Sequence, residues 1–243
     1  MKLFRVFLIQ FFIINSCWVI AQEGTYFYTG WGVEKFISTD VYNRIIIDNS
    51  NYLNTHTTAV QSAYKSPGAL NGLLLGLKMD NEVSTLFLGI HAHSYKSTAQ
   101  WTDSVPATFK RQMKVSHNGF AMGASWNMVS REFIRIGPMF CLNFEQFRTR
   151  LSYQTGLFVT DYDMPTDIFY FSTSLRFPFS FGGETFTFDL IPYYQLPFYK
   201  MNLTKLNNEM NKGFATDYTK EEMKQGVASY GIMATLNFSL KKH

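Results

Sequence analysis

Residues 169–190, FYFSTSLRFPFSFGGETFTFDL, alternate between aromatic side chains and small or polar ones. Successive side chains of a β-strand point to opposite faces, so the pattern predicts a hairpin with one almost wholly aromatic face. The other face of a water-soluble sheet normally carries Lys and Glu, whereas here it carries Ser, Thr, Gly and isolated charges. The aromatic face is therefore expected to be the outer surface, in apolar surroundings.

The same alternation recurs along the chain, with an apolar parity and a small or polar parity in each segment. The eight segments are 25–36, 70–79, 84–96, 113–129, 132–147, 168–181, 185–199 and 227–240. The polar parity is rich in Gly and Ser, which suit a narrow closed interior. We expect Pro138, Pro178, Pro192 and Pro197 to cause bulges or shortened strands, because proline lacks a ladder donor.

Short and long connections alternate without exception. The tight connections are 80–82, 130–132 and 182–184, and the long polar ones are 37–69, 97–112, 148–167 and 200–226. An up-and-down sheet with an even number of strands places all short turns at one end and all long loops at the other. After residue 22 no apolar run approaches the roughly 20 residues that a membrane-spanning helix needs. One short helical turn is expected in the last loop, through residues 219–222.

Over residues 24–240 the chain resembles the small eight-stranded outer-membrane barrels of the OmpA/OmpX type. The resemblance rests on the alternating strands, the alternating loop lengths and the closing strand YGIMATLNFSL, although residues 239–243 follow its last aromatic residue, Phe238. It implies an all-β fold: an eight-stranded antiparallel up-and-down transmembrane β-barrel with short periplasmic turns and long extracellular loops. It also implies a location in the outer membrane of a Gram-negative cell envelope, with outer-membrane lipid as a partner.

Residues 1–21 match a secretory signal peptide, with Lys2 and Arg5, an apolar run, and small residues before a cleavage site after Ala21. Residues 22–243 then form a single barrel domain. Two alternatives remain open, an uncleaved anchor helix and a lipoprotein signal that leaves Cys17 acylated. All three interpretations export the chain.

Charge and cysteine content exclude other classes. Without Lys2 and Arg5, the 22 basic residues fall to 20, against 18 acidic ones, so no nucleic-acid partner is expected. Only Cys141 remains after cleavage at Ala21, which excludes an intramolecular disulfide. We expect no cofactor.

Three histidines are the candidate metal ligands. His91 and His93 share the inner face of one strand, and His117 on the next segment is expected to lie opposite His93. We interpret them as polar filling of the lumen and assign no metal.

We also predict that the protein is not an enzyme. In the lipid A deacylases, which are barrels of this size, a His and a Ser two residues apart share the lipid-facing side. Here His93 directly precedes Ser94, which places the two on opposite faces, and no GxSxG or HExxH motif occurs.

Charged residues of inward parity are expected to form a network that plugs the lumen, because charges in a poorly hydrated interior need partners. They are Glu34, Lys78, Arg135, Glu145, Arg176 and Asp189. Folding the hairpin at Gly182-Gly183 predicts an ion pair between Arg176 and Asp189. A gated ion path along these residues is the alternative.

The sequence thus predicts a non-enzymatic outer-membrane barrel that acts through its long extracellular loops or as an accessory subunit of a larger envelope assembly. Loop 37–69 holds Tyr42, Ile45 to Ile47, Tyr52 and Tyr64, which we expect either to contact another envelope protein or to pack as a lid over the barrel mouth. The other functions considered are a lipid-modifying enzyme and an exported lipocalin-like binder of a small apolar ligand.

Overall fold

The computed structural model describes residues 24–57, 59–81, 83–102, 108–131, 133–155, 158–161, 166–183, 185–211 and 218–240. The signal-peptide interpretation of residues 1–21 lies outside the described residues.

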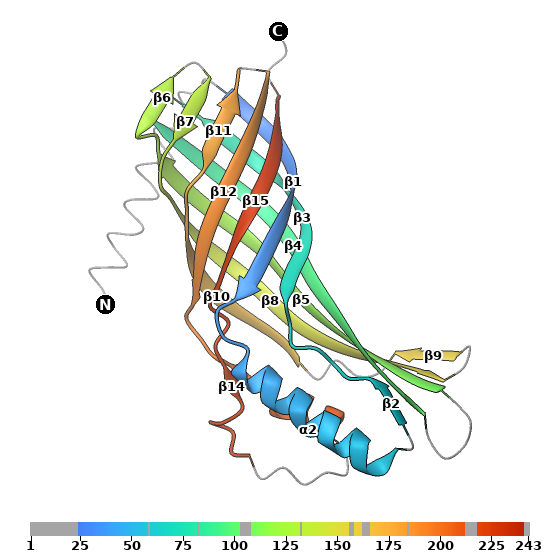
Figure 1. Ribbon diagram of the computed structural model, residues 1–243. Helices are drawn as coiled ribbons and strands as arrows, with labels where there is room; N and C mark the ends of the chain where they lie inside the picture. The colour runs from blue at the N-terminus through green and yellow to red at the C-terminus, as the bar shows by residue number, and fades with distance from the viewer. Residues whose placement is uncertain are drawn as a thin grey trace.

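Eight antiparallel strands form a closed ring (Figure 1). They are β1 (Gly24–Phe36), β3 (Ala69–Asp80), β4 (Ser84–Thr102), β5 (Thr108–Trp126), β8 (Met139–Thr155), β10 (Thr166–Arg176), β12 (Phe186–Pro197) and β15 (Ser229–Ser239). Each strand pairs with its neighbours in chain order, and β15 pairs with β1 to close the ring. The predicted fold, an eight-stranded antiparallel up-and-down barrel, is confirmed.

The two faces of every strand differ as the alternation predicts. The outward parity is apolar and accessible: Leu73, Leu75 and Leu77 on β3 are exposed, as are Leu88 and Ile90 on β4. The inward parity is buried and mixed in character. Ser, Thr, Asn, His and charged side chains share it with an apolar cluster formed by Tyr28, Leu74, Phe87, Ala121, Met139, Cys141, Ile191, Tyr193 and Met233. Because each β-strand exposes alternate residues to opposite sides, this polarity is the reverse of that of a water-soluble barrel.

Two of the four prolines interrupt strands as expected. β7 (Ile134–Ile136) is separated from β8 by Gly137-Pro138, and β11 (Phe179–Gly182) from β10 by Phe177-Pro178. β6 (Val129–Arg131) pairs with β7. Pro197 ends β12, whereas Pro192 lies inside β12 without shortening it. Its missing donor is tolerated because it lies opposite the break between β10 and β11, where the Phe177 amide donates to the Pro192 carbonyl at 2.9 Å.

The long loops contain structure that the sequence interpretation missed. α2 (Asp40–His56) lies across the end of the barrel at which β1 ends, and α3 (Thr204–Met210) contacts it (Figure 1). The short strands β2 (Ala59–Ser62), β9 (Phe158–Asp161), β13 (Met201–Asn202) and β14 (Lys224–Gln225) also lie in these loops. Residues 220–223 form a turn, and the Met223 amide donates to the Thr219 carbonyl at 3.3 Å, so the short helical turn expected at 219–222 is present as a single turn and does not extend into a helix.

None of the helices in the described ranges combines the length and apolar character needed to cross a membrane.

Three strands run beyond the lengths that the alternation predicts. β4 continues to Thr102, β5 begins at Thr108 and β8 continues to Thr155. They pair along their full lengths, so one wall of the barrel projects beside α2 (Figure 1).

Candidate functional site

A buried cluster of histidines and carboxylates lies in the lumen, between α2 and the tight turns. Its geometry follows from the strand register, in which His91 on β4, Gly119 on β5 and Glu145 on β8 stand side by side, with Tyr170 on β10 beyond Glu145. All four residues have inward parity. Because Gly119 carries no side chain, His91 and Glu145 reach each other across it.

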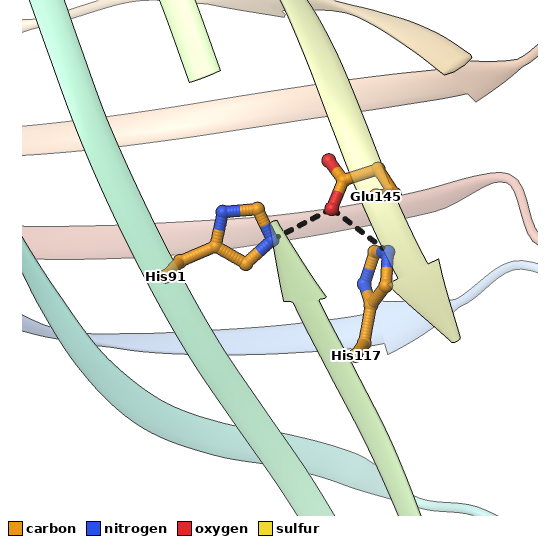
Figure 2. Close-up of side chains that lie close together, drawn as sticks. All are labelled: His91, His117 and Glu145. Atoms are coloured by element: carbon orange, nitrogen blue, oxygen red, sulfur yellow. Dashed lines mark ion pairs between the residues drawn. The ribbon is translucent and has the colours of Figure 1, made fainter. Parts of the chain in front are cut away.

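His91 and His117 point their Nε2 atoms at the same carboxylate oxygen (Figure 2). Glu145 Oε2 lies 3.0 Å from His91 Nε2 and 3.3 Å from His117 Nε2. The Tyr170 hydroxyl lies 2.6 Å from His117 Nε2. His117 and Glu145 are each 0% exposed, whereas the His91 side chain is 9% exposed.

A second carboxylate orients two of the imidazoles. Glu34, which comes from β1 across the lumen, accepts a hydrogen bond from His117 Nδ1 at 2.9 Å and one from His93 Nδ1 at 3.0 Å. Since a neutral imidazole has one donor nitrogen, donation from Nδ1 leaves the Nε2 lone pair of His117 directed at Glu145 and Tyr170.

Glu145 is held by its other oxygen. Gln195 Nε2 on β12 donates to Glu145 Oε1 at 3.1 Å. Within the described part of the chain, Glu145 Oε2 accepts no well-aligned hydrogen bond, and its close contacts are the two imidazole nitrogens, which form ion pairs with it only when they are protonated. A buried carboxylate oxygen in this state is costly unless a positive charge compensates it.

A second charged cluster lies nearer the tight turns. Lys78 Nζ lies 2.9 Å from Asp189 Oδ2 and 3.3 Å from Asp80 Oδ2, and it donates to Ser180 Oγ at 3.2 Å. Arg135 Nη1 lies 3.1 Å from Asp80 Oδ2, with its side chain 29% exposed. Two cations and two carboxylates therefore balance one another at this end of the lumen.

Arg176 does not form the ion pair with Asp189 that the sequence interpretation proposed. The register puts Ser180 opposite Asp189 and Tyr193 opposite Arg176, four residues away along β12. Arg176 Nη2 donates to Asn143 Oδ1 at 3.1 Å, and Nε donates to Ser174 Oγ at 3.2 Å. The guanidinium also lies over the Phe87 ring, 4.9 Å from its centroid, which is cation–π geometry.

An apolar core closes the lumen on the α2 side of the histidines. α2 contributes Val41, Tyr42, Ile45, Ile46 and Leu53 to it, and α3 contributes Leu206 and Met210. These side chains pack on the inward faces of the projecting strands, against residues that include Met113, Val115, Phe147 and Leu151. The aromatic and aliphatic residues of loop 37–69 are therefore mostly buried in a lid, although Ile47 is exposed.

Hydrogen bonds fix the lid. Gln225 Oε1 accepts from the Val41 amide at 3.0 Å, and Asn49 Nδ2 donates to the Met210 carbonyl at 2.7 Å. Burial raises the pKa of the Tyr42 hydroxyl far above its ordinary value, so Tyr42 stays neutral beside Thr149 Oγ1 at 3.4 Å.

The structure places the six predicted lumen charges in three groups. Glu34 and Glu145 lie with the histidines, Lys78, Arg135 and Asp189 lie with Asp80, and Arg176 lies between them. The sequence interpretation missed Asp80, Asn143, Tyr170 and Gln195. Inward parity marks Asn143, Tyr170 and Gln195, whereas Asp80 was assigned to a turn.

The fold defines the class: an eight-stranded antiparallel barrel of the kind found in small outer-membrane proteins, with a polar, filled lumen. No family model matches the chain, and no curated protein matches it in sequence.

Solved structures resemble the chain weakly. Ail, the attachment invasion locus protein of Yersinia pestis, is 10% identical, with 90% of this chain and 99% of Ail covered and a TM-score of 0.39. Ail in complex with the heparin analogue sucrose octasulfate gives 10% identity, coverage of 89% and 97%, and a TM-score of 0.38. The outer membrane protease OmpT from Escherichia coli gives 9% identity, coverage of 89% and 95%, and a TM-score of 0.35.

Proposed function

We propose that this protein is a non-enzymatic outer-membrane barrel with a sealed lumen, which acts through the surface that its lid and projecting strands present outside the cell. The observation that carries the proposal is the polarity of the barrel: an apolar outer belt encloses a filled interior that holds buried charges.

The outer belt supports insertion in a bilayer. Exposed apolar side chains occur on every strand of the ring, and they include Trp31, Leu75, Ile90, Met122, Phe144, Phe171, Leu190 and Leu236. A continuous apolar surface of this extent is unfavourable in water and is the outer surface that outer-membrane barrels require.

A row of basic residues supports contact with lipid headgroups. Lys96, Lys114 and Arg150 stand directly opposite one another on β4, β5 and β8, with outward parity and beyond the apolar belt. Lys96 and Lys114 carry like charges at paired positions, which repel, and an anionic group beside them would offset the repulsion. Phosphate groups of outer-leaflet lipid would supply such charge, which supports a lid on the extracellular side.

The filled lumen supports a barrel that neither conducts ions nor turns over a substrate. From α2 towards the tight turns, the interior holds the apolar core, then the histidine and carboxylate cluster, and then the cluster around Lys78. An eight-stranded barrel is only wide enough for its own side chains. A lipid substrate has no access to His117 or Glu145, and His93 and Ser94 lie on opposite faces, so the deacylase arrangement is not formed.

The filled interior also argues against a lipocalin-like binder, which would need an open apolar cavity for its ligand. The interaction surface proposed here is the outer face of the lid. On α2 it presents Asn43, Ile47, Asn51 and Asn54, which are exposed at helical spacing. Because the opposite face is anchored in the core, this surface is rigid enough to bind a partner protein of the envelope.

Three experiments test the proposal. Carbonate extraction of envelopes should leave the protein in the membrane, and the protein reconstituted in planar bilayers should not conduct; release by carbonate or a steady conductance would contradict it. For the partner, a photo-crosslinking amino acid at Asn51 should capture a protein in intact cells, whereas the same group at Thr25, at the opposite end of the barrel, should not give that product. Equal products from both sites, or none from Asn51, would contradict a role for the lid surface.

A further inference from the structure

We propose that His91, His117 and Glu145 bind one divalent transition-metal ion inside the barrel, and that zinc is the ion their donor atoms suit best. The inference goes beyond the proposed function and replaces the interpretation of these histidines as lumen filling alone. Its failure would leave the proposal for the lid and the membrane unchanged.

The ligand atoms lie close enough together to bind one zinc ion. His91 Nε2, His117 Nε2 and Glu145 Oε2 all lie within 4.8 Å of one another, and the carboxylate oxygen is 3.0 and 3.3 Å from the two nitrogens. Tetrahedral zinc with bonds of about 2.0–2.1 Å to nitrogen and oxygen separates its ligand atoms by about 3.3 Å. Two imidazoles and one carboxylate are a common zinc donor set.

The three donors come from neighbouring strands. His91 lies on β4, His117 on β5 and Glu145 on β8, and the pairing of these strands holds the donors in place without a flexible loop. The Tyr170 hydroxyl lies 2.6 Å from His117 Nε2, which is a hydrogen-bond distance and shorter than the separation of two zinc ligands, so a metal ion on this nitrogen would displace that hydrogen bond.

The surroundings of the ligands match those of known metal sites, in which a ligating histidine donates its other N–H to a carboxylate. His117 Nδ1 donates to Glu34, and the oxygen of Glu145 that faces away from the site accepts from Gln195. These contacts set the tautomer of His117 and the orientation of Glu145. They leave one lone pair of His117 and one of Glu145 directed at the same point.

Space and charge favour a cation at that point. A Cβ atom on residue 119 would lie 2.0 Å from Glu145 Oε2 and 2.7 Å from His91 Cε1, so the site exists only because Gly119 is a glycine. Glu34 and Glu145 together carry two negative charges, which one divalent ion neutralises while all three histidines remain neutral. The divalent ion also supplies a partner for Glu145 Oε2, which accepts no well-aligned hydrogen bond among the described residues.

The alternative occupant is a set of protons on His91 and His117, which would make the cluster a buried ion-pair network. A metal site binds added zinc and a protonated ion-pair network does not, so metal titration distinguishes the two alternatives. His93 provides a matched control, because it belongs to the same cluster and contacts Glu34 but contributes no atom to the site.

The test is calorimetric titration of the purified, EDTA-treated barrel in detergent with zinc chloride. We expect one zinc per chain, affinity at least about 100-fold weaker in His91→Gln and Glu145→Gln, and about 10–100-fold weaker in Glu34→Gln. His93→Gln should bind zinc as the wild type does. Unboiled gel mobility identifies any variant that fails to fold.

Cobalt titration of the wild-type protein gives a second test that needs no variant. One equivalent of cobalt should produce the visible absorption of a tetrahedral site, and one equivalent of zinc should abolish it. The inference is overturned if the wild type shows no saturable zinc binding and no such absorption, if Glu145→Gln keeps full affinity, or if His93→Gln loses as much as His91→Gln.

Discussion

The Lys78 ammonium lies 2.9 Å from the Asp189 carboxylate, with both side chains almost wholly buried in the lumen. Lys78 comes from β3 and Asp189 from β12, so the contact spans the interior rather than one strand pair. Asp80 and Arg135 extend it to four charges. The lumen near the tight turns is therefore filled by compensated charge.

Replacing Lys78 alone with Met should be strongly destabilising, because it leaves the Asp189 carboxylate buried without a cation. We expect a loss of about 3–5 kcal/mol in the free energy of unfolding. The double variant Lys78→Met with Asp189→Asn should be more stable than Lys78→Met alone. Urea unfolding in detergent measures both, and a double variant that is less stable than Lys78→Met would contradict the pairing.

Arg176 should couple energetically to Asn143 and not to Asp189. In a double-mutant cycle, Arg176→Met with Asn143→Ala should show an interaction energy of about 0.5–3 kcal/mol, because the two side chains share a hydrogen bond. Arg176→Met with Asp189→Asn should be additive within about 0.5 kcal/mol. The reverse result would restore the pairing expected from the sequence.

The lid should depend on the buried face of α2. Ile45 is 0% exposed and Ile47 is 58% exposed on the same helix, so they form a matched pair. Ile45→Asp buries an unpaired charge and should release the helix, which makes loop 37–69 sensitive to protease added to intact cells. Ile47→Asp should leave the loop protected, and equal cleavage of the two variants would show that the lid is not anchored this way.

The cost of a charge on the outer face should depend on depth. Leu190 lies in the middle of β12 and Phe186 at its end beside the tight turn, both with outward parity. Leu190→Arg should cost about 2–4 kcal/mol, and Phe186→Arg about 0–1 kcal/mol. Folding into lipid vesicles at graded urea concentrations measures the difference; similar costs at the two positions would argue against a bilayer around β12.

The strands were predictable because period-two alternation is a local signal. The eight segments follow from it, whereas the interruptions at Pro138 and Pro178 follow from the ladder donor that proline lacks. α2 was missed although Val41, Tyr42, Ile45, Ile46 and Leu53 have helical spacing. Its Ile and Asn residues have modest helix propensity, and the helix forms because tertiary packing buries one face.

The site was predictable only in part, because parity gives the face of a residue but not its partner. Parity placed His91, His93, His117, Glu34 and Glu145 inside. The partners depend on the strand register, which is set by the turn between β11 and β12. In this turn Gly182 pairs with Thr187, and the φ of Gly182 is 132°, a backbone angle suited to glycine. A turn centred on Gly182-Gly183 would have put Arg176 opposite Asp189.

Oxygen accessibility of spin labels tests the central claim, that lipid surrounds the aromatic face and that the polar face is enclosed. In a Cys141→Ala background, which removes the buried free thiol, nitroxides would be placed at Phe171 and Leu190 on the outer face and at Thr187 on the inner face. In lipid bilayers the labels at Phe171 and Leu190 should be relaxed strongly by dissolved oxygen, and the label at Thr187 should be shielded. Strong relaxation at Thr187 with shielding at Phe171 and Leu190 would mean a soluble barrel with an aromatic interior, and would contradict the account.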